Sequence, residues 1–318
     1  MAVTYTKFRE DSTSFPSNET SSVSFGENIP SGNLEAFIIR QTTTVATGGV
    51  LADYGNVYSS IRITLNGDVL FDFRQAVNGG GNNNPSALGY FLNKIGGVAT
   101  ERPSDLTKEA YFVIPVGVSV PAGVGRVEVQ IEYAGTATAS TAGSFQLWGR
   151  YNDAIQTTTR VVPATSFQAS NALEQVVVRI PQNMAGYTVA GVLVQNDSAS
   201  DELGSQGIRL MSQSQYGLDA DFIRLFSGDM QNGVMYADDD LSTTQQSYAF
   251  EVKGSLFIPC YNIAGGDLVL QVDSSASTTR TFTPVMVAPF GAKATDTVRQ
   301  TARVSANTSK AILDKTVQ

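Results

Sequence analysis

Residues 127–133 read VEVQIEY, and residues 268–274 read LVLQVDS. The two segments have similar sequences, and both have the pattern of a β-strand. In the first copy Val127, Val129 and Ile131 alternate with polar residues, the pattern of a strand with one buried face and one wet face. The second copy keeps the alternation, but a valine stands where the first copy has its first glutamate. We therefore expect the outward face of the second strand to be covered.

These strands belong to a duplication that runs through most of the chain. Further segments match in the same order: 22–25 with 176–179, 34–41 with 188–195, 61–65 with 208–211, 120–121 with 258–259 and 145–150 with 282–287. The offset between matched residues falls from 154 at Gln41 and Gln195 to 137 at Phe145 and Phe282. Loops change length more readily than strands, so this drift is typical of a duplicated domain.

Turn and helix signals divide each half into short elements. Asn66–Gly67 lies between two apolar runs and predicts a two-residue hairpin turn. A simple register would place Arg62 opposite Phe71, so we expect a bulge or a short second strand beside this turn. The remaining segments outside the helices read as short strands joined by turns rich in Gly, Asn, Ser and Thr.

One helix is predicted in each half. In the first half Asn84 and Pro85 suit a helix start, and Gly96–Gly97 suits its end. Between them Leu88, Leu92 and Ile95 form an apolar stripe at helical spacing. In the second half residues 219–226 occupy the corresponding place, and Phe222, Ile223 and Phe226 supply an apolar face there.

The predicted fold is all-β, with two tandem eight-stranded antiparallel sandwiches and a short helix in each. Each half is about 140–150 residues long, which suits such a sandwich. We assign residues 1–160 to the first sandwich, with 1–20 as an N-terminal arm, and residues 161–290 to the second. Residues 152–172 read as the linker that enters the second half, and 291–318 as a C-terminal arm.

The composition narrows the classes of function. Charged residues make up 16% of the chain, against roughly 25% in a typical soluble domain, and the formal net charge is −8. An acidic chain does not attract nucleic acid over its whole surface, so any such contact is expected to be local. Histidine is absent, which removes the commonest general base and the usual zinc ligand.

The single cysteine and the first residues bear on the compartment. Cys260 has no partner for a disulfide within the chain, and its neighbours in LFIPCY (256–261) predict a packed, unreactive thiol. The start, MAVTYTKFREDSTS, has no apolar region of a secretory signal, and no apolar run is long enough to span a membrane. We expect a soluble protein made in a cytoplasm.

Two tandem sandwiches of this size, with SIRITLNGDVL (60–70) leading into a helix-bearing segment, resemble the double jelly-roll major capsid proteins. These proteins build the icosahedral shells of tailless, often membrane-containing phages and of adenovirus-like viruses, and the smaller phage members are the most similar. The resemblance covers about residues 20–290 and has no diagnostic motif. It rests on the duplication, the size and the order of the strands.

The resemblance implies a structural protein with jelly-roll sandwiches, no enzymatic activity and no cofactor. In that family three chains form a homotrimer whose six similar lobes imitate a hexagon and tile a shell. Neighbouring capsomers, penton proteins and minor capsid proteins would be the partners, and the protein would be found in the virion after synthesis in the host cytoplasm. The alternative function is a glycan-binding module of a phage spike or an extracellular lectin.

The C-terminal arm reverses the charge of the chain. Its basic residues are Lys293, Arg299, Arg303, Lys310 and Lys315. Against Asp296 and Asp314 they leave a balance of +3. We interpret the arm as an inner-face segment that touches anionic lipid head groups, the genome or a neighbouring capsomer. The plainer interpretation is a tail with scattered charges.

For four other candidate sites the sequence favours an interpretation without a binding or catalytic function. Asp238–Asp240 lacks the ligand spacing of a calcium loop and reads as a solvated turn. Gly79–Gly81 lacks the following Lys of a phosphate loop. Trp148 and Tyr151 could stack on a sugar, but packing in the core or between lobes is the favoured role. Glu128 and Glu132 share a strand face but lie about 13 Å apart, too far for paired glycosidase carboxylates.

Overall fold

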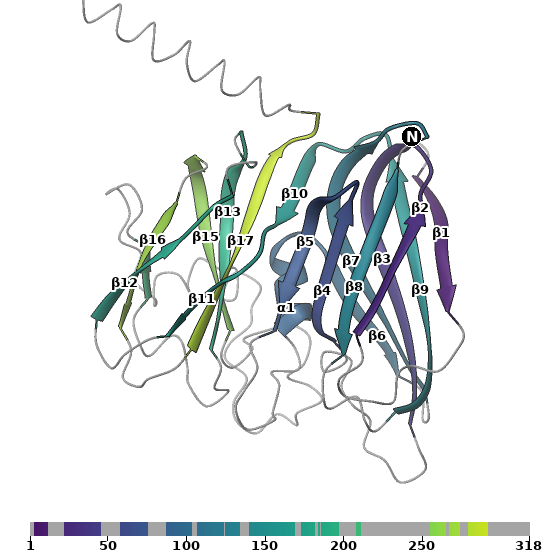
Figure 1. The fold of residues 1–318 in the computed structure, drawn as a ribbon, viewed down its shortest axis with the longest axis horizontal. Helices are drawn as coiled ribbons and strands as arrows, with labels where there is room; N and C mark the ends of the chain where they lie inside the picture. Colours follow the sequence, from purple (N-terminus) through teal and green to yellow (C-terminus); the bar gives the residue numbers. More distant parts are fainter. Residues whose placement is uncertain are drawn as a thin grey trace, which may run out of the picture.

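The computed structural model describes residues 3–11, 22–45, 58–75, 87–103, 107–123, 125–133, 140–168, 173–181, 184, 186–196, 208–210, 255–264, 267–273 and 279–291. Within these ranges the chain forms 17 strands and one helix. Figure 1 shows two groups of strands side by side, with the strands of both groups running in roughly the same direction. The all-β prediction is confirmed. In the described part of the chain no helix is long and apolar enough to cross a membrane.

The first group is a two-sheet sandwich, which we call the first sandwich. Its strands are β1 (Val3–Asp11), β2 (Ser22–Asn28), β3 (Gly32–Val45), β4 (Tyr58–Leu65), β5 (Asp68–Arg74), β6 (Val98–Pro103), β7 (Thr107–Val120), β8 (Arg126–Tyr133) and β9 (Ser140–Asn152). One sheet has the order β1-β9-β3-β7-β6 and the other β2-β8-β4-β5. The sheets pack face to face, as shown by edge-on ring contacts of Tyr58 with Phe112 at 5.3 Å and of Phe25 with Phe145 at 5.5 Å.

The second group is the second sandwich. Its strands are β10 (Thr157–Val161), β11 (Thr165–Gln168), β12 (Leu173–Val178), β13 (Thr188–Asn196), β14 (Ile208–Leu210), β15 (Ser255–Ala264), β16 (Leu268–Asp273) and β17 (Thr279–Pro289). One sheet has the order β10-β17-β13-β15, with β11 also pairing β17, and the other β12-β16-β14. Val192 and Val194 of the first sheet meet Leu268 and Leu270 of the second in one buried cluster.

The two sandwiches share one strand order. The sheet β1-β9-β3-β7 corresponds to β10-β17-β13-β15, and β2-β8-β4 corresponds to β12-β16-β14. The offset of 137 residues that matches Phe145 with Phe282 also matches the last residues of β9 and β17, Asn152 and Pro289. A counterpart of β5 would fall between residues 211 and 254, outside the described residues.

The stretch VEVQIEY forms β8 with the predicted faces. Val127, Val129 and Ile131 are buried in the core, whereas Glu128 and Gln130 are exposed. In its counterpart β16, Leu268, Leu270 and Val272 are likewise buried.

No described residue fully covers the outward face of β16. Val269 there is half-buried, and Val177 opposite it on β12 is 46% exposed. The described residues therefore do not supply the cover that the sequence predicts for this face.

The strand registers correct two of the sequence matches. Phe25 lies opposite Val129, and Val176 lies opposite Leu270, so Phe25 corresponds to Val176 and the match at Ser22 is wrong by three residues. An odd slip moves every side chain to the other face of a sheet. Similarity between short segments does not determine which residues point to which face of the sheet. The pairing of each strand with its neighbours does.

The second correction concerns β3 and β13. Gln41 lies opposite Phe145, and Val194 lies opposite Phe282. Gln41 therefore corresponds to Val194, and the predicted match with Gln195 is wrong by one residue. The sequence match was placed one residue off because it paired two identical residues, Gln41 and Gln195. A shift of one residue exchanges the two faces of a strand, so these side chains occupy different faces of their sheets.

Two segments that we expected to be arm or linker form strands. Residues 3–11, part of the predicted N-terminal arm, are β1 and pair with β9 along their length. Residues 152–172, expected as a linker, contain β10 and β11, which both pair with β17. Ser and Thr are common in loops but also suit strands, so composition alone misled here.

The Asn66–Gly67 hairpin is confirmed, with positive φ at both residues (52° and 87°), as a type I′ turn requires. The expected bulge is also present. Leu65 lies opposite Asp68, whereas Arg62 lies opposite Asp72, because the register shifts between Ile63 and Thr64.

The helix of the first half is α1 (Ala87–Lys94). Leu88 and Leu92 are buried and Ile95 packs against the same core, as the stripe predicts. Gly96 has φ +81° and ends the helix, and the amide of Gly97 donates to the carbonyl of Leu92 at 2.8 Å. The predicted start at Asn84 and Pro85 and the predicted helix at 219–226 lie outside the described residues.

Candidate functional site

The two sandwiches form one body through an apolar contact. The outer face of the sheet β10-β17-β13-β15 covers the edge of the first sandwich between β5 and β7, where α1 also lies (Figure 1). Val161, Leu193, Phe257 and Val285 of the second sandwich belong to the same buried cluster as the first sandwich's core. Apolar burial therefore joins the two halves, in addition to the chain connection.

Helix α1 carries the aromatic part of this contact. The ring of Phe91 stacks on Phe73 at 5.7 Å and lies 6.5 Å from the ring of Phe257 in β15. The backbone amide of Phe257 donates a buried hydrogen bond to the hydroxyl oxygen of Tyr90, at 3.0 Å. The sequence predicted the helix but not its role in this contact. The apolar stripe of the helix was assumed to pack within the first sandwich alone.

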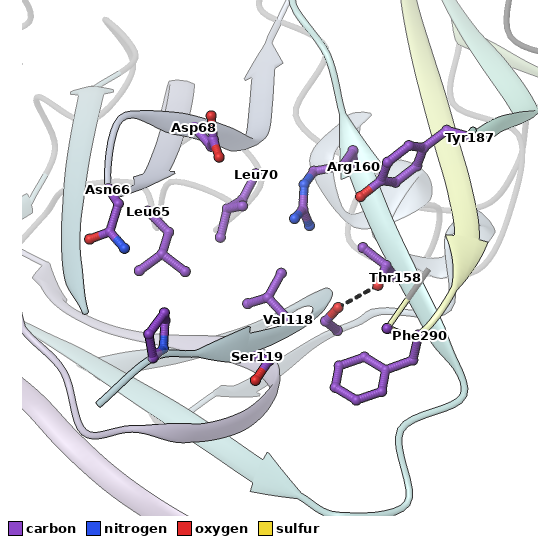
Figure 2. A pocket seen from close by; sticks show the side chains of 13 residues that line it. Leu65, Asn66, Asp68, Leu70, Val118, Ser119, Thr158, Arg160, Tyr187 and Phe290 are labelled. Carbon is purple, nitrogen blue, oxygen red and sulfur yellow. Dashed lines mark hydrogen bonds between the residues drawn. The ribbon is translucent and has the colours of Figure 1, made fainter. Parts of the chain in front are cut away.

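A close backbone approach forms the other part of the contact. The hydroxyl of Thr158 in β10 donates to the carbonyl oxygen of Gly117 in β7, at 2.7 Å (Figure 2). Gly117 has φ +55°, and a Cβ built there would lie 2.0 Å from the carbonyl oxygen of Thr157. Only glycine fits this conformation and this spacing without strain.

A cavity of about 390 Å³ lies at one end of the same contact (Figure 2). The β4–β5 turn and the end of β7 line it from the first sandwich, and β10 and the residues after β17 line it from the second. Its last lining residue, Gly291, is also where the predicted C-terminal arm begins.

Arg160 points its guanidinium into this cavity (Figure 2). The guanidinium donates to the carbonyl oxygens of Val116 at 3.3 Å and Thr159 at 3.1 Å. Burial lowers the pKa of Arg160 from its ordinary value, and Tyr187 and Asp68 act in the opposite direction. The arrangement is suited to hold a small group that accepts hydrogen bonds. Only one feature of the sequence could have indicated this cavity, namely an arginine within the Thr-rich segment before residue 162.

Trp148 has a different position from the one that the sequence favoured. It is half-buried on the outer face of the sheet β1-β9-β3-β7-β6, away from both the core and the contact between sandwiches. Its Nε1 donates to Oε1 of Gln146 at 3.0 Å, and the Lys7 ammonium lies 5.7 Å from its ring centroid. Trp148 therefore does not pack in the core, as the sequence favoured, or between the two lobes of one chain, and packing between lobes of different chains stays a prediction.

Tyr151 points to the opposite side of β9. It packs in the core of the first sandwich, and its hydroxyl donates to the carbonyl oxygen of Pro30 at 2.9 Å. Burial raises its pKa to about 12. Trp148 and Tyr151 therefore do not form a common platform for a sugar ring.

Cys260 is a packed thiol, as predicted. It is buried in the second core, its Sγ donates weakly to the carbonyl oxygen of Ile258, and burial raises its pKa to about 12. The two glutamates of β8 are exposed, and each contacts an arginine. Glu128 contacts Arg126 at 3.4 Å, and Glu132 contacts Arg74 at 4.0 Å.

Several predicted sites lie outside the described residues. They are Lys293, Arg299, Arg303, Lys310 and Lys315 of the C-terminal arm, together with Gly79–Gly81 and Asp238–Asp240. Among the residues that are described, no group of three or more Cys, Asp or Glu side chains is placed to hold a metal ion.

Comparison with known proteins gives a match in structure but none in sequence. No protein-family model and no curated protein matches this chain. The major capsid protein of bacteriophage PM2 is similar over 91% of this chain and 98% of that one, with a TM-score of 0.50 and 13% identity. The STIV major capsid protein is similar over 91% and 97%, with a TM-score of 0.56 and 11% identity. A structure of Sulfolobus turreted icosahedral virus gives 0.57 over 90% of both chains, at 10% identity.

The chain has the double jelly-roll fold. Each sandwich described above is one jelly roll, and the similarity extends over both of them and not over a single copy. At 10–13% identity the shared feature is the fold itself. The three similar structures above are all of viral capsids, and nothing supports the glycan-binding alternative.

Proposed function

We propose that this double jelly roll is the major capsid protein of a tailless icosahedral virus, a structural protein that works by assembly and without catalysis. The observation that carries the proposal is the near-complete overlap with capsid proteins in both directions. About nine-tenths of this chain overlaps nine-tenths or more of the proteins from bacteriophage PM2 and STIV. A fold alone does not determine function, so the geometry has to suit the task as well.

The duplicated architecture suits a three-fold building block with six walls. Each chain supplies two jelly rolls of the same strand order, so a homotrimer supplies six similar lobes. Such a trimer has the outline of a hexagon and can pack against six neighbours. The buried contact through α1 and β10 keeps the two lobes of a chain at a fixed angle, which a regular tile requires.

The strand edges also suit a protein that is present at high local concentration. Free sheet edges promote uncontrolled pairing between chains, and the two-sheet jelly roll limits them. In this protein the edge between β5 and β7 is closed by α1 and by the second jelly roll. Assembly would then proceed through side-chain contacts between lobes, which are individually weak enough to allow correction.

The partners follow from the same proposal. Neighbouring capsomers, penton proteins and minor capsid proteins would surround the trimer in the virion, after synthesis in the host cytoplasm. The C-terminal arm begins beside the cavity between the lobes, at Gly291. Its balance of +3 suits contact with an internal lipid membrane or the genome.

Light scattering coupled to size-exclusion chromatography tests the proposal. One chain has a mass of 33.8 kDa. We expect a stable species of three chains, roughly 101 kDa from that mass, or assembled particles at higher concentration. A mass of one chain at every concentration, with no particles in the electron microscope, would refute a shell-building role.

A further inference from the structure

The cavity between the two jelly rolls contains a positive charge that no described carboxylate neutralises. Arg160 uses one nitrogen, Nη1, for both of its hydrogen bonds, to the carbonyl oxygens of Val116 and Thr159. With the described residues its Nε and Nη2 form no hydrogen bond, and the guanidinium forms no ion pair. Nε and Nη2 are the side-by-side donors that bind both oxygens of a carboxylate, so this fork of the guanidinium is available to a ligand.

The guanidinium is costly to hold in this position without an anion. Burial lowers the pKa of Arg160, because removal of water disfavours the charged form. Asp68 is the one carboxylate among the described residues that line the cavity, but it is exposed and not within contact of the guanidinium. An anion that enters the cavity would replace the lost water with charge-assisted hydrogen bonds.

The walls beside the guanidinium are largely apolar. Leu65, Leu70 and Val118 of the first jelly roll are buried side chains that line the cavity, and Phe290 lines it from the second. Figure 2 shows the hydroxyl of Tyr187 turned toward the guanidinium, and this hydroxyl has no hydrogen bond with another described residue. The volume of about 390 Å³ falls within the range of roughly 300–1,000 Å³ that is typical of small-ligand sites.

The charges of the lining favour an anion with a single negative charge. One guanidinium balances one such charge, and the carboxylate of Asp68 acts on the same part of the cavity and repels a second. A carboxylate is also planar, which matches the two parallel donors of the guanidinium. The lining therefore favours a carboxylate over a phosphate dianion.

We propose that this cavity is a binding site for a carboxylate carried on a short apolar group, with Arg160 as its anchor. The carboxylate accepts hydrogen bonds from Nε and Nη2, and the apolar group lies against the leucines and the valine of the first jelly roll. Two sources supply this chemistry, a free organic acid and the C-terminal residue of a peptide. The site goes beyond the proposed capsid function and does not depend on it.

Ligand-observed NMR titration of the full chain tests the site with matched pairs of probes. Butyrate and N-acetyl-leucine carry the carboxylate, whereas butyramide and N-acetyl-leucinamide carry a neutral amide in its place. We expect each acid to bind at least tenfold more tightly than its amide, since a hydrogen bond to a charged group contributes about 1.5–3 kcal/mol. Inorganic phosphate should bind more weakly than butyrate. Equal binding of the acids and the amides would overturn the proposal.

The same titration distinguishes the two sources of the carboxylate. Tighter binding of N-acetyl-leucine than of butyrate would support the end of a peptide as the ligand. The reverse order would support a free organic acid. Both results require the carboxylate site, so either one supports the proposal.

Two substitutions should change the affinity for butyrate in opposite directions. Arg160→Gln removes the fork and should weaken binding at least tenfold. Asp68→Asn removes the repelling charge and should strengthen binding roughly two- to fivefold, a gain that damage to the fold does not produce. Arg74→Gln is the control and should have no effect, because this arginine is 69% exposed and lies outside the cavity.

Circular dichroism and the melting temperature show whether each variant is folded. Wild-type affinity in folded Arg160→Gln protein, or no gain in Asp68→Asn, would overturn the proposed site. The Asp68→Asn variant and the amide probes decide the matter even where Arg160→Gln does not fold. The capsid function is tested separately by the mass of the oligomer, so the two proposals can fail independently.

Discussion

The hydroxyl oxygen of Tyr90 in α1 accepts a hydrogen bond from the backbone amide of Phe257 in β15, at 3.0 Å. The two residues belong to different jelly rolls and are 167 positions apart in the chain. This bond, the neighbouring contact of Phe91 with Phe257, and the contact of β10 with β5 and β7 make two copies of one fold into a single body.

Removing the Tyr90 hydroxyl should weaken that body. Tyr90→Phe leaves the buried amide of Phe257 without its acceptor, which costs about 1–3 kcal/mol of unfolding free energy. Denaturant unfolding followed by circular dichroism measures it. Tyr5→Phe, on an exposed strand position, is the control and should change stability by less than about 0.5 kcal/mol. Equal effects of both substitutions would contradict the role given to Tyr90.

The close approach of β7 to β10 predicts a specific intolerance at Gly117. Gly117→Ala would bring a Cβ within 2.0 Å of the Thr157 carbonyl oxygen, whereas Gly123 also has positive φ (+75°) but nothing within 4 Å of its Cβ position. Both variants pay the cost of a positive φ, so their difference isolates the clash. We expect Gly117→Ala to be less stable than Gly123→Ala by roughly 1–3 kcal/mol, the usual cost of overpacking. Similar melting temperatures would show that the strands separate without cost.

The sequence alone was enough for the architecture. Period-2 alternation placed Val127, Val129 and Ile131 inward, and the Asn-Gly pair placed the β4–β5 turn together with its bulge. Both signals are local, and local signals survive in a single sequence. The order of matched strands then gave two tandem sandwiches.

The sites were harder, because they depend on which faces meet. The alternation of β9 puts Phe145 and Leu147 on one face and Trp148 on the other. This pattern was sufficient to predict that Trp148 points outward. The sequence analysis nevertheless favoured packing in the core or between lobes for this residue. Arg160 and Tyr90 acquire their roles only from the packing of one jelly roll on the other, which the sequence of either half does not specify.

Burial of Cys260 predicts a dependence of stability on alkaline pH. Its pKa rises from the ordinary 9.0 to about 12, so above pH 9 the unfolded chain releases a proton that the folded chain keeps. Stability must then fall as pH rises from about 9 to about 12, by up to about 2 kcal/mol at pH 10.5. Cys260→Ala should remove this part of the loss, while the contribution of Tyr151 stays in both proteins. Parallel pH profiles of the two proteins would contradict the assignment.

The proposed inner-face role of the C-terminal arm predicts salt-dependent binding to anionic surfaces. Replacing Lys293, Arg299, Arg303, Lys310 and Lys315 by glutamine should reduce binding to phosphatidylserine vesicles at least tenfold at low salt, since each basic residue near such a membrane contributes about 1 kcal/mol. Vesicle flotation measures it, with neutral vesicles as the control. Binding that is unchanged by the substitutions, or equal on neutral vesicles, would assign the arm another role.

Electron microscopy of the purified protein tests the central claim most directly. Class averages viewed along the strands should show six lobes of similar size arranged with three-fold symmetry, because three chains each supply two jelly rolls of one design. Particles with two lobes only, or rings whose lobe number is not a multiple of six, would contradict the claim that this chain builds hexagon-like capsomers.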